Sequence, residues 1–373
     1  MTRPTRQAET DEVSAAFHVA LTQIGVQTTA EALALWADVP ADLRAATAGG
    51  WLRRAISLVM GRRRQARDLA RAYYRLARAL QTGSTVADPY HPEPTHVTLG
   101  DLRREFAALA GTYSPPTSSG ADKAATGEPG EASTAHKEDP QPVEEGDPAA
   151  PEKGERQELE DGDWEKILVE ELKGLREEEE RLERAAEEEL RTVLDALGTQ
   201  NLNRRLAGVD DQQPAKGADA ARAEAHRQAG ARQAAAASRV AMNGARSSNW
   251  THMRRDRRAL GYVRLSRTGT PCGWCAMLIS RGPVYKSESS ATFADGDKYH
   301  DGCHCYAMPV WSRDQYQSSE LTALSRRYEA LWPEVTKGHS GKAAVTVWRR
   351  FIRSKQRAAA QEARQSTNTT QEA

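Results

Sequence analysis

The residues best suited to chemistry in this chain are four cysteines and their neighbouring histidines, which all fall in one short stretch. Cys272 and Cys275 form a C-x2-C pair, and after 24 further residues His300 and Cys303 repeat the x2 spacing. Two thiolates from one tight turn and two ligands from a second segment suit the tetrahedral coordination of Zn²⁺. We therefore predict a structural zinc site, in which protein atoms fill all four positions.

The choice of the four ligands stays open, because Cys305 and His304 lie beside the second pair. If residues 303–307 are extended, we expect Cys303 and Cys305 to point to opposite faces, so that only one of them binds the metal. Cys305 is then the rival of Cys303, and His304 is the weaker rival of His300. Two disulfides or free thiols are the alternatives to a metal, and a cytosolic chain favours the metal.

A catalytic role for the metal has little support in the sequence. Pro271 and the C-x2-C pair fit the second half of the zinc deaminase signature, which also needs an upstream H-x-E. Neither His226 nor His252 begins such a triplet. A zinc nuclease would use His300 or His304 as its base, and the metal would then lose a ligand. We expect a protein that is not an enzyme.

The elements around these ligands are predicted to form a small α+β zinc-knuckle module at residues 261–312. Its first residues alternate apolar side chains as a short strand does. Gly273 and Gly302 are expected to relieve the turns that carry the two arms. A C-terminal helical segment and tail follow at 313–373. The predicted fold class is mainly α, with a helical N-terminal domain and a long amphipathic helix joined to this module.

Residues 1–112 are predicted to form the helical N-terminal domain. Apolar residues recur at helical spacing up to Gly25, where we expect the first helix to stop. A short second helix is expected to open with a capping box at Thr28. A longer helix over residues 51–81 should end at Gly83.

The middle of the chain divides into two parts. Residues 113–160 are rich in Pro, Gly, Ser, Thr, Ala and Glu, which predicts a disordered linker. Residues 161–260 are predicted to be long helices, first acidic and then rich in Ala and Arg. The acidic helix should start at Asp163, end at Gly198 and bury its leucine stripe against basic helices of this chain or of another subunit. The second helix is expected to break near Gly244.

The composition excludes several classes of protein. Of 373 residues 39% are hydrophobic, and Lys+Arg 52 against Asp+Glu 52 gives a net charge of zero, which excludes a uniformly basic DNA-coating protein. No apolar run approaches the ~18 residues of a membrane span, and the N-terminus carries no apolar signal-peptide core. We expect a soluble chain that is made in the cytosol and has no membrane partner.

A dense basic stretch precedes the predicted module and consists of Arg254, Arg255, Arg257 and Arg258. These arginines could bind packaged DNA by neutralising its phosphates. The alternative is an intramolecular pairing of this stretch with the acidic helix expected at 163–197.

Several segments together resemble the MuF-like minor head proteins of tailed bacteriophages, in the form found in phages of actinobacteria. In that group a C-x2-C is followed by Gly-x-Val-Tyr/Phe and closed by H-x2-C-x-C. The similarity is strong over residues 250–312 and weaker on both sides. The segments that carry it are residues 254–264, 271–278, 281–285, 300–305, 331–342 and 69–80.

The resemblance implies a minor capsid component that is present in few copies and acts near the portal in head assembly or DNA delivery. The implied partners are the portal and major capsid proteins, and the implied location is the virion head, with the host cytoplasm during assembly. The closing motif of the family often reads H-P-x-C-R-C, where this chain has Asp301 and His304. The alternative function is a capsid maturation protease, which would need a Ser, a His and an orienting group at one site.

Overall fold

The protein is described here by a computed structural model that covers residues 5–40, 45–91, 94–116, 165–212, 217–266, 271–283 and 299–371. Most of the predicted disordered linker, from residue 117 onward, lies outside the described residues. The predicted fold class, mainly α, is confirmed. Within the described ranges, no helix combines the length and the apolar character needed to cross a membrane.

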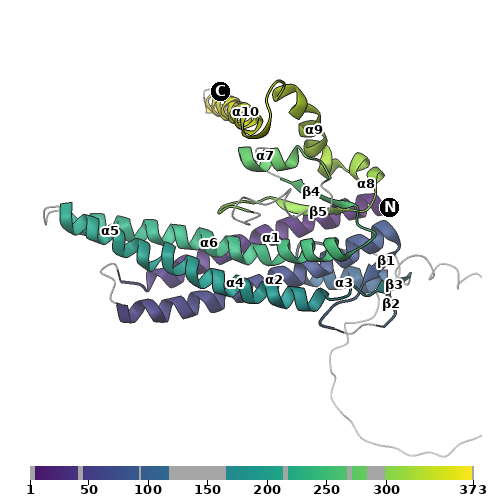
Figure 1. Cartoon of the computed structure of the whole chain (residues 1–373), viewed down its shortest axis with the longest axis horizontal. Helices are drawn as coiled ribbons and strands as arrows, with labels where there is room; N and C mark the ends of the chain where they lie inside the picture. Colours follow the sequence, from purple (N-terminus) through teal and green to yellow (C-terminus); the bar gives the residue numbers. More distant parts are fainter. Residues whose placement is uncertain are drawn as a thin grey trace, which may run out of the picture.

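Five long helices lie side by side and form the body of the molecule (Figure 1). Helix α6 runs through this bundle and packs against each of the other four. Its buried face is rich in small alanines, which lets the neighbouring helices approach closely. The five helices are α1 (Arg6–Ala37), α2 (Ala45–Thr82), α4 (Leu175–Leu197), α5 (Thr199–Gln212) and α6 (Ala218–Arg255).

Two glycines that were expected to interrupt helices are instead helix-packing positions. Helix α1 continues through Gly25 and Thr28, and α6 continues through Gly244, so the predicted stop, capping box and break were wrong. A Cβ at Gly25 would lie 2.6 Å from Sδ of Met242, and one at Gly244 would lie 2.3 Å from the carbonyl oxygen of Arg63. These positions need glycine because a second helix lies against them.

The ends of two helices agree with the prediction, while the start of the acidic segment does not. Helix α2 ends before Gly83, which has a φ of +71°, and α4 ends before Gly198. The acidic segment begins with strand β3 (Lys166–Glu170) and not with a helix. This strand lies between β1 (Ser84–Val86), to which it is parallel, and β2 (His96–Thr98), to which it is antiparallel. Pairing with distant segments therefore overrides the local helical pattern.

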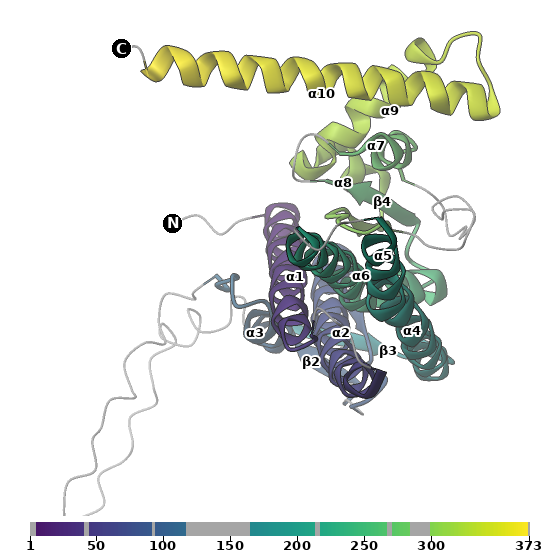
Figure 2. The ribbon, with the colours of Figure 1, turned by 90° about the vertical axis from the view of Figure 1, so that its left-hand side faces the viewer.

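The remaining elements lie on one side of the bundle (Figure 2). The predicted strand is confirmed as β4, which pairs with β5 in antiparallel register. Helix α10 is the outermost element, and α7 and α9 lie between it and the bundle. These elements are β4 (Gly261–Leu265), α7 (Gly273–Ile279), β5 (Tyr306–Val310), α8 (Arg313–Ser318), η2 (Glu320–Thr322), α9 (Ala323–Val335) and α10 (Gly341–Gln371), and α3 (Leu99–Ala110) lies beside the bundle.

The hydrophobic core is divided around the predicted ligands. Strands β4 and β5 share one core with α1, α2 and α3, in which the rings of Phe17 and Tyr73 stack 4.3 Å apart. A separate, smaller core joins α7 to α9 and α10 around Trp348, which is fully buried. A further core lies within the bundle around Trp36 and Trp51. Three of the cysteines and Tyr299 form a cluster of their own. The cysteines thus lie where the smaller core meets the rest of the molecule.

Candidate metal centre

Each of the two predicted arms is shaped by its local backbone. Cys272 is the N-cap of α7, and its sulfur accepts the backbone N–H of Cys275 at 3.4 Å. The first turn of α7 then carries Cys275 into the interior, where it is 1% exposed. On the second arm Gly302 has a φ of +71°, and the N–H of Cys303 donates to the carbonyl of His300 at 3.1 Å.

The expectation for the first glycine was wrong. Gly273 does not relieve a turn through positive φ, because it is the first residue of α7. A Cβ at this position would lie 3.1 Å from Cγ of Arg349 on α10. Because α10 approaches this closely, a side chain at residue 273 would be crowded.

The structure brings the five predicted ligands together. Nε2 of His300 lies 3.1 Å from Sγ of Cys272 and 3.9 Å from Sγ of Cys275. Sγ of Cys275 also lies 3.6 Å from Sγ of Cys303. The donors form two trios, Cys272–Cys275–His300 and Cys275–Cys303–Cys305, and in each the ligand atoms lie within 4.8 Å of one another. This cluster could hold a metal ion.

The expectation that Cys303 and Cys305 diverge was wrong. Strand β5 itself begins at Tyr306. Alternation places residues two apart, such as 303 and 305, on the same face of an extended segment, so the expectation had the direction reversed. Both sulfurs therefore face Cys275. His304, the weaker rival as a ligand, is exposed and belongs to neither trio, while its carbonyl accepts a hydrogen bond from Nε2 of His18 at 2.7 Å.

The four cysteines are free, so the disulfide alternative does not match the structure. Hydrogen bonds from Cys275 and His300 lower the pKa of Cys272 to about 4. The hydrogen bond to Cys272 raises the pKa of His300 to about 9. Hydrogen bonds from the neighbouring thiols also lower the pKa of Cys303. Cys272 and Cys303 thus favour the thiolate, the form of cysteine that binds metals. Hydrogen bonds within the cluster raise the pKa values of Cys275 and Cys305.

The ring of His300 is oriented by its own backbone. Its Nδ1 donates a hydrogen bond to the carbonyl of Asp301 at 2.8 Å, which directs Nε2 toward the thiols. Histidine ligands of metals are commonly held in this way by a carbonyl on the second ring nitrogen. Nε2 is therefore the ring nitrogen that faces the thiols and could bind a metal ion.

Four residues around the cluster were missed by the sequence analysis. The guanidinium groups of Arg246 and Arg264 lie over Tyr299, each 3.9 Å from the ring centroid. Arg246 also donates to the carbonyls of Cys303 and Cys305, and Arg239 pairs with Asp301 at 2.7 Å. Arg239 and Arg246 are seven residues apart on α6, two helical turns, and this spacing within an Ala-rich helix was the available signal.

The basic stretch is engaged largely within the chain. Arg254 and Arg255 both pair with Glu178 of the acidic helix α4, the intramolecular alternative that the sequence left open. Arg258 pairs with Glu170 of β3 at 3.1 Å. Arg257 is exposed.

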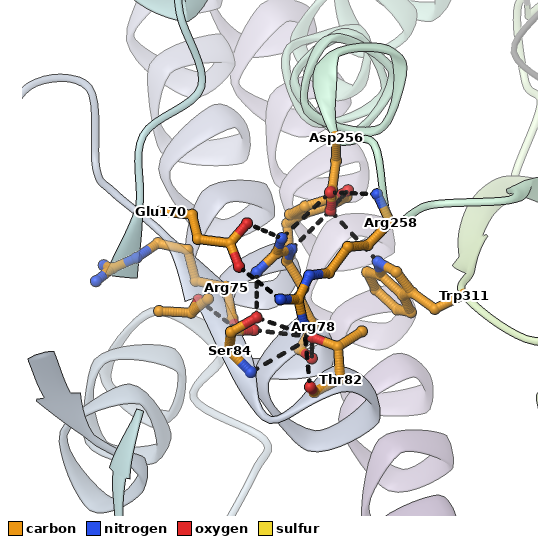
Figure 3. A network of polar contacts seen from close by, with 10 residues as sticks. Arg75, Arg78, Thr82, Ser84, Glu170, Asp256, Arg258 and Trp311 are labelled. Atoms are coloured by element: carbon orange, nitrogen blue, oxygen red, sulfur yellow. Dashed lines mark hydrogen bonds and ion pairs between the residues drawn. The ribbon is translucent and has the colours of Figure 1, made fainter. Parts of the chain in front are cut away.

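Asp256, in the middle of this stretch, is the centre of a buried network (Figure 3). Its carboxylate accepts from Nε of Arg78 at 2.7 Å and from the hydroxyl of Tyr74 at 3.0 Å. Trp311, just after β5, lies 3.4 Å away. These hydrogen bonds fix the C-terminal end of α6 to α2 and to the sheet of β4 and β5.

A serine, a histidine and a carboxylate also meet inside the bundle. The hydroxyl of Ser248 donates to Glu179 at 2.8 Å and lies 3.4 Å from Nδ1 of His252, which bonds the Ser248 carbonyl at 2.9 Å. All three side chains are buried. A protease would need its serine open to a peptide, so this set acts as a packing network.

Fold and cluster together define a mainly helical protein with a cysteine–histidine site that could hold a metal ion. Residues 207–331 match the family described as VG15 protein, so the chain contains a VG15 protein domain. This domain begins within α5, includes every predicted ligand and ends within α9. No curated protein and no solved structure matches the chain.

Proposed function

We propose that this chain is a structural component of the head of a tailed phage, a minor capsid protein that acts near the portal in head assembly or DNA delivery. The support is the resemblance over residues 250–312 together with a closed donor set of the structural kind. The VG15 protein domain covers the same residues. The proposed location is the virion head, and the proposed partners are the portal and major capsid proteins.

We propose further that the cluster binds one structural Zn²⁺ through Cys272, Cys275, Cys303 and His300. The orientation of His300, with Nδ1 on a carbonyl and Nε2 beside two thiols, is the observation that carries this assignment. A thiolate-rich set with one imidazole suits zinc. Cys305 then stays a thiol beside Cys303. The zinc would hold the two arms together and so stabilise the fold.

The buried arginines support a negatively charged metal–thiolate centre. Three thiolates and one Zn²⁺ leave a net negative charge, which is costly in the interior unless cations lie near. Arg264 reaches Sγ of Cys303 at 3.6 Å, and Arg246 is 4% exposed beside the same segment. Arginine stays protonated even when buried.

Metal content and X-ray absorption of the purified full-length chain test the zinc site. We expect about one zinc per chain with three sulfur neighbours and one nitrogen neighbour. His300→Ala should lower zinc affinity, and Cys305→Ser should leave it nearly unchanged. Four sulfur neighbours and a strong effect of Cys305→Ser would replace His300 by Cys305 in the ligand set. A folded chain without metal would overturn the zinc proposal.

Sedimentation of assembled heads tests the structural role. The chain is co-expressed with portal and major capsid proteins, and head particles are separated from free protein. We expect the chain in the particle fraction in few copies, and the major capsid protein at its full length. A chain found only in the free fraction contradicts the role in the head. Shortening of the capsid protein that depends on this chain would favour the maturation protease.

A further inference from the structure

Helix α10 carries a row of basic side chains along one side. It contains seven Lys or Arg residues and one Glu. At 3.6 residues per turn, six of the seven fall within a sector of about 100°, while Lys355 and Glu362 lie on other sides. We call these six the basic stripe: Lys342, Arg349, Arg350, Arg353, Arg357 and Arg364.

The opposite side of α10 fixes the direction of the stripe. Trp348 and Ile352 are buried against α7 and α9, in the small C-terminal core. Figure 2 shows α10 as the outermost layer, with its C-terminal half extending past α9. All six stripe residues are exposed. The stripe therefore faces outward, with Arg349 at its edge beside Gly273 and Trp274 of α7.

Among the described residues, the positive charges of the stripe are not neutralised by carboxylates, whereas those of other arginines in this chain are. Arg63 and Arg78 of α2 and Arg103 of α3 each bind a carboxylate. Across the part of the chain that the structure describes, no stripe residue forms an ion pair with a carboxylate. Arg349 makes a cation–π contact with the ring of Trp274. Arg349, Arg353 and Arg357 are also spaced by four, an arrangement in which like charges repel along a helix. An anionic partner would relieve this repulsion.

We infer that the basic stripe of α10 is a binding site for the phosphate backbone of duplex DNA. From Lys342 to Arg364 the stripe covers 22 residue steps, about 33 Å of straight helix, close to one turn of duplex DNA. Duplex DNA carries one negative charge per ~1.7 Å, so such a row of cations meets phosphates along its whole length. Single strands are bound mainly by stacking on aromatic rings, and the aromatic residues Trp348 and Phe351 lie on the other side of α10.

This inference stands apart from the metal site and replaces the earlier candidate at Arg254–Arg258, whose arginines are mostly paired within the chain. The VG15 protein match ends at residue 331 and does not include α10. An acidic protein surface is the rival partner. The acidic helix α4 of the same chain is a poor candidate, because Glu178 and Glu183 already bind arginines of the bundle.

Fluorescence anisotropy of the full-length chain with a labelled duplex of random sequence tests the inference. For six phosphate contacts the affinity should fall about 10³-fold between 50 and 200 mM salt. The quadruple variant Arg350→Gln, Arg353→Gln, Arg357→Gln and Arg364→Gln should lower the slope of log affinity on log salt by about 3.6. The same four positions changed to Lys should retain binding.

The matched control removes four positive charges elsewhere on the surface: Arg104→Gln, Arg176→Gln, Arg181→Gln and Arg227→Gln. We expect it to keep most of the duplex affinity, and circular dichroism should show both quadruple variants to be folded. Equal losses in the two variants would overturn the site. So would equal affinity for single-stranded DNA, displacement by polyglutamate as efficient as by duplex, or a wild-type chain that binds no duplex at all.

Discussion

Cys275 differs from the other donors because it belongs to both trios of the cluster. Its loss breaks each trio, whereas loss of Cys305 leaves the trio of Cys272, Cys275 and His300 intact. We therefore expect Cys275→Ser to abolish zinc binding and to lower the melting temperature of the C-terminal part. Zinc titration with a chromophoric chelator, with Cys305→Ser as the matched control, checks this. Equal zinc content in both variants would contradict it.

The stability of the bundle depends on pH through a single residue, His252. Burial lowers its pKa below 6.5, so the folded chain keeps it neutral while the unfolded chain gains a proton. The stabilising contribution is complete above pH 6.5 and is lost as the pH falls toward the folded-state pKa. Urea unfolding between pH 7.5 and 5 should show a steeper loss of stability for wild type than for His252→Leu. Exposed His339→Gln should behave like wild type.

At the scale of elements, the crossing of α2 and α6 depends on Gly244. A methyl group there would meet a backbone carbonyl oxygen at 2.3 Å, and backbone cannot move aside as a flexible side chain can. We expect Gly244→Ala to lower the free energy of unfolding by ~1–3 kcal/mol. Gly61→Ala on α2 meets nothing within 4 Å and should instead stabilise by ~0.5–1 kcal/mol. If urea unfolding shows that both Gly244→Ala and Gly61→Ala are less stable than wild type, this packing argument is wrong.

The ion pair of Arg78 and Asp256 joins two elements that are far apart in the sequence. Their side chains are 0% and 1% exposed, so removing one partner leaves a buried charge. Asp256→Asn should cost ~3–5 kcal/mol of unfolding free energy. The exposed pair of Arg104 and Asp101 should contribute at most ~1 kcal/mol, which Arg104→Gln measures without touching the capping hydrogen bonds of Asp101. If breaking either ion pair lowers the unfolding free energy by a similar amount, burial does not determine the strength of these pairs.

Features set by nearby residues could be predicted from the sequence, and those set by remote partners could not. The two ligand arms and the helix ends at Gly83 and Gly198 follow from local spacing and backbone preference. The role of Gly25 depends on a helix more than 200 residues away. Strand β3 depends on two strands that end 80 and 68 positions before it. The arginines over the ring of Tyr299 come from α6 and β4, which meet there only in the folded chain.

At the scale of the whole molecule, the cluster lies between the small C-terminal core and the large one. Zinc removal should therefore loosen α7, α9 and α10 while the bundle persists. Hydrogen exchange of the full-length chain with and without chelator measures this directly. We expect faster exchange in α7 and α10 and unchanged exchange in α2. A uniform increase over both parts would mean that the metal stabilises one cooperative unit.

The central place of β3 also has a consequence for synthesis on the ribosome. Strands β1 and β2 leave the ribosome first, and β3, which lies between them, starts 68 positions after the end of β2. At about 5–20 residues per second the two early strands wait several seconds with open edges. Open edges are templates for pairing between chains. Nascent chains that stall before residue 165 should therefore aggregate, while chains released after residue 170 can close the sheet.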